Sequence, residues 1–438
     1  MSAILMVFSE YDMSTSKMPP KFPEILKSLG NRRMGVMLML GFASGLPLAL
    51  TGGTLQAWLA TASIDIKTIA IFSLVGLPYT LKFIWAPIMD RFVPPCFGRR
   101  RGWILITQGL LIGLVITMAY SPPEQAILFV GTLAVMIAFC SASQDIAIDA
   151  YRADLLQPEE RGFGAALSVA GYRIAMLVSG GLALIVADQL GWEFTYTLMA
   201  ILLLAGVVTA VAGPEPACQP ETPATLQQAV IQPFREFLAR PRSVWIIIFI
   251  ILYKAGDALA GTLTTAFLIR GLDFSLTDVG IINKWLGLAA LLLGAMAGGT
   301  MMVRFGLYKC LLWFGLLQAL TNLGFMLLAL AGKNYAGMMI VIAMENLAGG
   351  MGTAVFVALL IALCDHRYTA TQYALLSALS AIARVFAGPP SGVLVELLGW
   401  AQFFLITFIA AIPGLLLLLW LRETIEHYHN DQVAISGS

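Results

Sequence analysis

Residues 42–51 read FASGLPLALT, and residues 253–262 read YKAGDALAGT. The two stretches carry the same residue at four equivalent positions, namely a glycine, a leucine, an alanine and a threonine. Each matched pair is separated by 211 residues, and the same spacing separates Arg173 from Arg384. Internal repeats of this kind are typical of membrane chains that fold as two related halves. The repeat therefore predicts a duplicated architecture.

The composition places both halves in a lipid bilayer. Of the 438 residues, 59% are apolar and 12% are charged, and the mean hydropathy is +0.84. A soluble domain carries about 25% charged residues, so an ordinary water-soluble enzyme is excluded. The 26 Lys and Arg against 25 Asp and Glu give a formal charge of +1. This balance offers no basic field for a nucleic acid partner.

Long apolar runs predict membrane-spanning helices. A spanning helix needs about 20 predominantly apolar residues, whereas a barrel strand alternates apolar and polar residues over about ten. Because the runs are continuous, we predict an all-α membrane protein with twelve transmembrane helices. The predicted spans are 34–60, 68–89, 103–121, 126–150, 163–187, 194–212, 243–268, 278–301, 309–331, 337–363, 372–396 and 401–421.

One polar stretch separates the spans into two sets of six. Two pseudo-symmetric six-helix halves are the architecture of the major facilitator superfamily. We predict a cytoplasmic N-terminal segment (1–33), an N-terminal bundle (34–212), a cytoplasmic linker (213–242), a C-terminal bundle (243–421) and a cytoplasmic tail (422–438). In the linker, Leu226, Val230, Phe234 and Phe237 recur at helical spacing, which predicts an interfacial helix on the cytoplasmic membrane surface.

The distribution of Lys and Arg predicts the orientation. Eighteen of them fall in the N-terminal segment, the loops after even-numbered spans and the tail, and only Lys67, Arg270 and Lys333 fall in the other loops. Basic loops stay on the cytoplasmic side of a membrane. Both termini are therefore predicted to be cytoplasmic, in a multi-pass protein of a bacterial inner membrane.

The charges inside the predicted spans are candidates for a transport pathway, because an intramembrane charge is costly unless it is paired or hydrated. Five cations lie there: Lys82, Arg173, Lys254, Lys284 and Arg384. Three acids accompany them: Asp145, Asp257 and Glu345. The surplus of two positive charges favours an anionic cargo, although counting Asp149 reduces the surplus to one.

Two arrangements of these charges remain open. Lys254 and Asp257 are three residues apart, on one helical face, so they either line a cavity or form a salt bridge that only fixes helix packing. Arg173 and Arg384 have no acid nearby in the sequence, so they either line the cavity or pair with another helix. The other polar candidates for binding cargo are Gln144, Tyr172, Asn283 and Asn346.

The carboxylates are the candidates for proton coupling. Asp145 and Asp149 are one helical turn apart, and two neighbouring carboxylates favour a shared proton. Asp149 has an alternative role, because it could pair with Arg91 or Arg99. Asp145 is therefore the stronger candidate, and Glu345 and Asp257 are further ones.

The loop after the second span carries Asp90-Arg91 and, after six residues, Gly98-Arg99-Arg100-Arg101. It resembles the D-R-x-G-R-R signature of the major facilitator superfamily, although the insertion is longer than usual. The resemblance implies a cytoplasmic latch formed by Asp90, Arg91, Arg99 and Arg100. The alternative is simple anchoring of a basic loop on the cytoplasmic side.

Several long blocks resemble the AmpG-type muropeptide permeases. They are GFASGLPLAL at 41–50, GGTLQAW at 52–58, FCSASQDI at 139–146, MLVSGGLAL at 176–184, ENLAGGMGTAVFVALL at 345–360 and ATQYALLSALSA at 370–381. The resemblance implies a proton symporter that imports GlcNAc-1,6-anhydroMurNAc peptides for peptidoglycan recycling, a flux that also feeds β-lactamase induction. The nearest alternative cargo is another anionic conjugate, such as an acetyl-CoA-like molecule, and a less favoured alternative is an integral membrane enzyme acting on wall sugars.

We expect no cofactor and no metal. The five cysteines show neither C-x-x-C spacing nor neighbouring histidine pairs, so no metal site is predicted. The sequence carries no Walker motif, which leaves the proton as the coupling ion. The expected partners are an anionic glycopeptide, protons and the lipid bilayer, and the protein is expected to act as a monomer without catalysing a reaction.

Overall fold

The computed structural model describes residues 32–94, 97–156, 158–214, 232–364 and 369–426. Within these ranges every regular element is helical, so the all-α fold class is confirmed. The predicted segment 1–33 lies outside the described residues apart from Arg32 and Arg33. Most of the predicted linker and tail also lies outside them.

Twelve helical stretches of the described chain are long and apolar enough to cross a membrane, in agreement with the prediction. They are Arg32–Thr61, Ile66–Ile84, Arg99–Ala119, Pro123–Leu155, Phe163–Leu190, Trp192–Ala212, Ser243–Gly271, Leu276–Phe305, Leu307–Ala331, Tyr335–Ala362, Leu375–Leu398 and Trp400–Trp420. Each boundary lies within five residues of its predicted position. Hydropathy located the spans well because it is a property of the local sequence.

Contacts group the described helices into two compact units. We call them the N-unit, residues 32–55 and 81–214, and the C-unit, residues 56–80 and 232–426. The third change of unit along the chain falls in the predicted linker. The segment 56–80, which includes most of the second span, belongs by its contacts to the C-unit.

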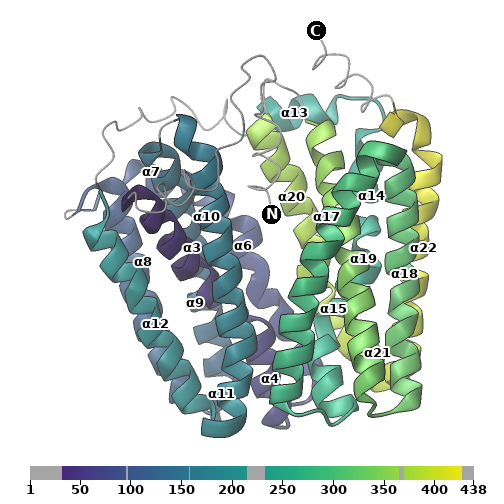
Figure 1. Cartoon of the computed structure of the whole chain (residues 1–438), viewed down its shortest axis with the longest axis horizontal. Helices are drawn as coiled ribbons and strands as arrows, with labels where there is room; N and C mark the ends of the chain where they lie inside the picture. Colours follow the sequence, from purple (N-terminus) through teal and green to yellow (C-terminus); the bar gives the residue numbers. More distant parts are fainter. Residues whose placement is uncertain (1–31, 95–96, 157, 215–231, 365–368, 427–438) are drawn as a thin grey trace, which may run out of the picture. The chain divides into compact units, whose positions relative to one another are not determined.

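The N-unit is built mainly from long helices. These are α3 (Arg32–Thr51), α7 (Ala86–Arg91), α8 (Arg99–Ala119), α9 (Pro123–Leu155), α10 (Pro158–Leu177), α11 (Ala183–Leu190) and α12 (Trp192–Ala212). Helices α8 and α12 lie side by side (Figure 1). Helix α10 packs closely on α3, because a Cβ at Gly171 would lie 2.0 Å from the Leu38 carbonyl oxygen. A π-helical turn, Val178–Leu182, joins α10 to α11.

The C-unit contains α5 (Ile66–Ile71), α13 (Gln232–Leu238), α14 (Ser243–Tyr253), α15 (Ala255–Ala266), α16 (Leu276–Asp278), α17 (Gly287–Phe305), α18 (Leu307–Ala331), α19 (Tyr335–Ala362), α20 (Thr369–Phe386), α21 (Gly388–Leu398) and α22 (Trp400–Trp420). Helix α4 (Gly53–Thr61) and helix α6 (Leu77–Leu81) each cross a boundary between the two units. In the C-unit, α17 packs along α19, and α18 packs along α22 (Figure 1). In the eighth span of the chain, a π-helical segment, Val279–Leu286, follows α16.

Residues 56–80 join the C-unit because α5 and the following 3-10 turn, Phe72–Gly76, pack on α21. Gly388 makes this approach possible, since a Cβ there would lie 2.0 Å from Ser73 Oγ and 2.1 Å from the Ala70 carbonyl oxygen. Ser73 Oγ donates a hydrogen bond to the Val385 carbonyl at 2.8 Å, and Lys67 Nζ lies 2.6 Å from Glu396 Oε2. The segment is thus held by backbone, hydroxyl and charge contacts together.

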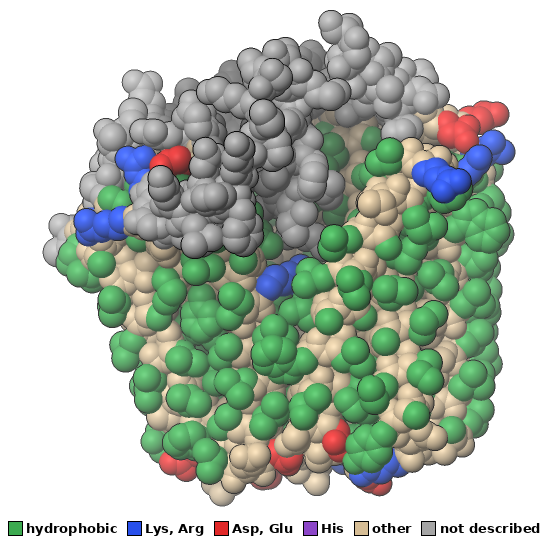
Figure 2. All heavy atoms as spheres, viewed as in Figure 1, with side chains coloured by type: hydrophobic (Ala, Val, Ile, Leu, Met, Phe, Trp, Pro, Cys, Tyr) green, Lys and Arg blue, Asp and Glu red, His purple; other side chains and the backbone are tan. Residues whose placement is uncertain are grey.

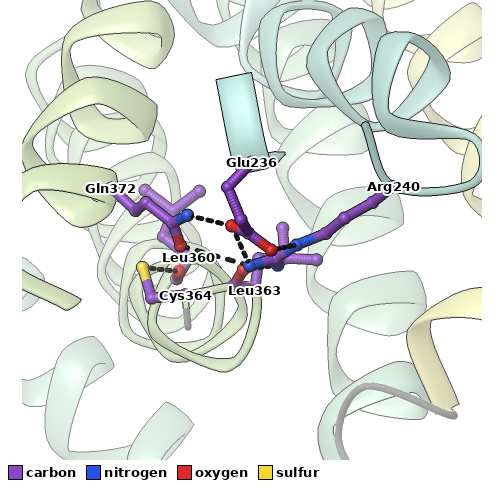
Figure 3. Close-up of polar contacts among 6 residues, drawn as sticks. All are labelled: Glu236, Arg240, Leu360, Leu363, Cys364 and Gln372. Carbon is purple, nitrogen blue, oxygen red and sulfur yellow. Dashed lines mark hydrogen bonds and ion pairs between the residues drawn. The ribbon is translucent and has the colours of Figure 1, made fainter. Parts of the chain in front are cut away.

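The linker helix α13 is anchored to the C-unit rather than only resting on a membrane surface. Phe237 is 1% exposed and packs in the hydrophobic core of the unit. Glu236 pairs with Arg240 at 2.7 Å and accepts a hydrogen bond from Gln372 Nε2 at 2.5 Å (Figure 3). Arg240 also donates to the Leu363 carbonyl at 2.6 Å. These bonds join α13 to the ends of α19 and α20.

On the face shown in Figure 2, charged side chains lie mainly toward the two ends of the helices, and apolar side chains cover the surface between them. Arginines of the predicted cytoplasmic side bind one helix terminus: Arg32 donates to the Ala212 carbonyl, and Arg101 donates to those of Ala210 and Val211. The last carbonyls of a helix have no partner within the helix and carry partial negative charge. The basic residues therefore complete the C-terminus of α12.

Candidate functional site

A cluster of polar side chains lies in the C-unit around Asp257. Helix α14 ends at Tyr253, and Lys254 separates it from α15, which carries Asp257 in its first turn. Lys254 Nζ lies 3.6 Å from Asp257 Oδ2 and 3.5 Å from Thr353 Oγ1. The ammonium group also lies 5.7 Å from the centre of the Phe356 ring. The predicted contact between Lys254 and Asp257 is therefore present.

Gln318 completes this cluster from α18. Its Nε2 donates a hydrogen bond to Asp257 Oδ2 at 3.2 Å, so the same carboxylate oxygen faces an amide and an ammonium group. Gln318 is 5% exposed. Its amide lies against Gly352, where a Cβ would approach Oε1 to 2.3 Å. The cluster thus joins three helices of one unit: α15, α18 and α19.

The remaining C-unit candidates lie on several elements. Lys284, in the π-helical segment, lies 3.4 Å from Thr265 Oγ1, and Asn283 is half-buried beside it. Asn346 donates to the Ile342 carbonyl at 2.9 Å, so its amide is partly engaged within α19. Glu345 is half-buried, and Arg384 is exposed. Among the residues that the structure describes, neither Glu345 nor Arg384 has an ion-pair or hydrogen-bond partner.

In the N-unit, the two neighbouring aspartates have different surroundings. Ser44 Oγ donates a hydrogen bond to Asp145 Oδ1 at 2.5 Å, which joins α3 to α9. Asp149 is 55% exposed at its side chain and pairs with Arg152 at 3.0 Å. A shared proton between the two carboxylates stays a prediction. Within the described chain, the ion pair of Asp149 is with Arg152 and not with Arg91 or Arg99. Asp145 is the one held between helices.

Gln144 and Gln108 form a buried amide pair between α9 and α8. Gln144 Nε2 donates to Gln108 Oε1, and Gln108 Nε2 donates to the Leu203 carbonyl at 2.5 Å. Both glutamines are fully buried. Gln144 therefore supports the packing of the N-unit, and its side chain is not open to a ligand in this conformation.

Three further N-unit candidates lie on α10 and the second span. Arg173 is half-buried, and its guanidinium donates to Met176 Sδ at 3.9 Å. Over the part of the chain that the structure describes, no carboxylate lies within ion-pair distance of Arg173. Tyr172 and Lys82 are also half-buried. Arg173 and Arg384, matched by the repeat, are thus both cations without a carboxylate partner.

The basic loop of the predicted latch is tied to neighbouring helices. Arg100 pairs with Asp154 at the end of α9, at 2.8 Å, and the side chains of both are mostly buried. Arg99 is buried, and Arg91 is exposed at the end of α7. The side chain of Asp90 lies outside the described residues. The latch therefore remains a prediction, whose observed ion pair is Arg100–Asp154.

Sequence reasoning missed Gln318, Gln108 and Thr353. One signal was available, because Gln108 and Gln318 are 210 residues apart, which is one residue from the spacing of the repeat. A neutral amide in an apolar helix is a weaker sequence signal than a charge, although its burial also requires hydrogen-bond partners.

Comparisons with known proteins show the family to which the chain belongs. Residues 35–386 match the model of the Major Facilitator Superfamily. The anhydromuropeptide permease of Escherichia coli strain K12 is 52% identical over 405 residues, which cover 92% of this chain and 82% of that protein. A putative transporter, AmpG 4 of Rickettsia felis, is 34% identical over 412 residues, covering 92% of this chain and 99% of that protein.

Solved structures show the same fold at low sequence identity. A POT family transporter crystallised with 5-aminolevulinic acid gives a TM-score of 0.72 at 15% identity, covering 90% of this chain and 96% of that one. The nucleoside transporter NupG gives 0.69 at 14% identity, covering 89% of this chain and all of that one.

Among the described residues, no group of three His, Cys, Asp or Glu side chains is arranged to hold a metal ion.

The contact between Lys254 and Asp257 should stabilise the fold. We expect Lys254→Ala and Asp257→Ala each to lower the melting temperature of the detergent-purified protein, because each leaves a mostly buried charge without its partner. The double variant should lose less than the sum, with a coupling of roughly 1–3 kcal/mol.

The exposed pair Arg422–Glu426, whose atoms lie 3.1 Å apart, is the matched control, and it should show no measurable coupling. Additive effects at Lys254 and Asp257 would show that the two charges act independently.

Proposed function

Because the chain belongs to the Major Facilitator Superfamily and, within it, to the family of the anhydromuropeptide permease, we propose that it imports anhydromuropeptides by proton symport. The observation that carries the proposal is the 52% identity to a permease of that name over most of both chains. The relatives and structural neighbours are transporters, and the protein is a transporter rather than an enzyme.

The unpaired cations support an anionic glycopeptide as the cargo. A muropeptide carries carboxylates on its peptide and hydroxyls on its sugars. A guanidinium can bind a carboxylate through two parallel hydrogen bonds, and Arg173 and Arg384 have no carboxylate partner within the described chain. Lys82 and Lys284 add positive charge in the same two units. Half-buried amides such as Asn283 suit the sugar hydroxyls.

Two intramembrane carboxylates with defined partners support proton coupling. Asp145 is hydrogen-bonded to Ser44, and Asp257 is bonded to Gln318 beside Lys254. A carboxylate held within a membrane bundle is a natural site for loading and releasing a proton. Coupling to the proton gradient would drive uphill import without a cofactor.

We place the protein in the bacterial inner membrane as a monomer, with both termini in the cytoplasm. The excess of Lys and Arg in the loops that follow even-numbered spans supports this orientation. The loop before α5 and the loop after α21 then face the periplasm. Residues 62–76 and α21 would form a periplasmic gate.

The packing of α5 on α21 supports such a gate. Asp65 caps the start of α5, and its hydrogen bonds with Thr68 hold the pKa of the carboxyl below its usual range. Arg270 donates to the Ile64 carbonyl, and Gln56 donates to the Thr262 carbonyl at 2.5 Å. Alternating access would separate α5 from α21 once in each cycle.

Energised uptake tests the function directly. Right-side-out membrane vesicles containing the full chain should accumulate labelled anhydromuropeptide when an inward proton gradient is imposed. An uncoupler should abolish accumulation and leave exchange of labelled for unlabelled muropeptide intact, because exchange needs no net driving force. Accumulation that persists with the uncoupler would overturn proton coupling. Accumulation of acetyl-CoA instead of muropeptide would identify a different cargo.

Arg384 should bind an acidic group of the cargo. Arg384→Gln is expected to raise the KM for muropeptide uptake about 10- to 100-fold, the usual effect of losing one charge-assisted hydrogen bond. The maximal rate should change much less. Arg304→Gln is the control, because Arg304 is an exposed arginine at the end of α17 that packs on Phe305. An unchanged KM for Arg384→Gln would remove this residue from the binding site.

A bulky residue at position 388 should hold the proposed gate open. Gly388→Leu places carbon atoms where Ser73 and Ala70 now lie, and we expect uptake to fall at least about tenfold, given the usual cost of overpacking. An impermeant maleimide should label Ser73→Cys faster in this background. Gly299→Leu, at a glycine with open space around its Cβ, should leave the labelling unchanged. Equal labelling in both backgrounds would argue against a gate at α5 and α21.

A further inference from the structure

Gln318 occupies an unusual place for a neutral side chain in the C-unit. It reaches from α18 to the carboxylate of α15, where its Nε2 lies 3.2 Å from Asp257 Oδ2. Lys254 approaches the same oxygen from the junction of α14 and α15 at 3.6 Å. The carboxylate is thus bound by two donors that come from different helices.

The glutamine amide differs from the ammonium group in what it can offer. Lys254 can only donate hydrogen bonds, so it favours the ionised carboxylate. An amide presents a donor on one atom and an acceptor on the other. After a rotation of the amide, the same side chain can accept a hydrogen bond from a protonated carboxyl. Gln318 is therefore suited to both protonation states of Asp257.

The packing around Gln318 holds the amide at this place. Gly352 lies directly behind it, and a Cβ there would lie 2.3 Å from Oε1 and 2.7 Å from Cδ. The glutamine is 5% exposed, so water does not compete freely for its polar atoms. The absence of a side chain at position 352 thus provides the space that the amide fills.

The N-unit also contains a buried glutamine that lies against a glycine, in this case without a carboxylate. Gln108 lies against Gly206, where a Cβ would approach its Nε2 to 2.6 Å. Its partners are the neutral Gln144 and the Leu203 carbonyl. The two halves therefore share a buried glutamine facing a glycine, and only the C-unit places that glutamine against a titratable group.

We propose that Gln318 is a positioning residue for proton coupling, which holds the Asp257 carboxylate beside Lys254 and provides a hydrogen-bond partner in both its ionised and its protonated form. This inference rests on the proposed function and names Asp257 as the carboxylate that exchanges the proton. The other titratable groups that interact electrostatically with Asp257 or Lys254 are Tyr253, Glu345 and Arg384, and Cys310 lies near Tyr253. Farther along the surrounding elements lie Tyr308 and Lys309 on α18, Tyr335 on α19, Tyr373 on α20 and the Lys67–Glu396 pair at α21.

The test compares the pH dependence of two matched variants in proteoliposomes. Gln318→Met keeps the length and approximate volume of the side chain and removes the amide. The amide can bind both forms, but its hydrogen bond to the ionised carboxylate is the stronger of the two, so its loss should let the protonated form persist to higher pH. We expect the midpoint of the uptake profile against external pH to move up by about one unit. Gln108→Met removes the equivalent buried amide and should leave the midpoint in place, even if the rate falls.

A second readout does not require transport. A carbodiimide modifies carboxyls in their protonated form, so the rate of Asp257 modification against pH, measured by mass spectrometry, should show the same upward shift in Gln318→Met. If that variant fails to insert into membranes, Gly352→Ala provides the test. Its added methyl group displaces the amide without removing it, and the shift should have the same sign.

The possible outcomes distinguish the role of Gln318 from the proposed proton-driven import. A wild-type midpoint that is retained in both Gln318→Met and Gly352→Ala would overturn the role of Gln318 and leave proton-driven import standing. An equal shift in Gln108→Met would also overturn it, because loss of any buried amide would then suffice. Wild-type uptake that does not depend on pH would overturn the proposed coupling and this inference together.

Discussion

The absence of hydrogen-bonding solvent inside a bilayer is the constraint on which the rest of this structure depends. A polar group that faces lipid or packed helices must find its partner within the protein, whereas a group that lines a hydrated cavity need not. The consequences are visible at Asp257, which is bound by Gln318 and Lys254, and at Asp145, which is bound by Ser44. Because these partners come from different helices, the same bonds that satisfy the charges also fix the packing of each unit.

The sequence predicted the features that depend on neighbouring residues. The twelve spans follow from local hydropathy, and the contact between Lys254 and Asp257 follows from a spacing of three residues. It could not supply partners that are far apart along the chain. Gln318 lies 61 residues from Asp257, and Gln372 lies 136 residues from Glu236. Local spacing also did not identify the partners of the two neighbouring aspartates, since Asp149 pairs with Arg152 and Asp145 binds Ser44 on another helix.

Chain order and packing disagree over the second span, and the reason is steric. Chain order assigns residues 56–80 to the first half, yet α5 packs on α21 of the C-unit. The close approach depends on Gly388, which has no side chain to separate Ser73 from the start of α21. A hydropathy profile treats this glycine as one small residue among many. Its importance becomes apparent only when the backbone opposite it is known.

The internal repeat explains why both units contain a buried glutamine on equivalent helices, although the partners of the two glutamines differ. Duplication placed a glutamine near the middle of α8 and of α18, each facing a glycine of a neighbouring helix. A buried glutamine can take either a neutral or an ionisable partner, because its amide can both donate and accept hydrogen bonds. In the N-unit the partner is Gln144, whose amide does not titrate, and in the C-unit it is Asp257. Two related bundles can therefore use the same kind of buried amide differently. Gln108 supports helix packing in the N-unit, and Gln318 binds the titratable carboxylate of Asp257 in the C-unit.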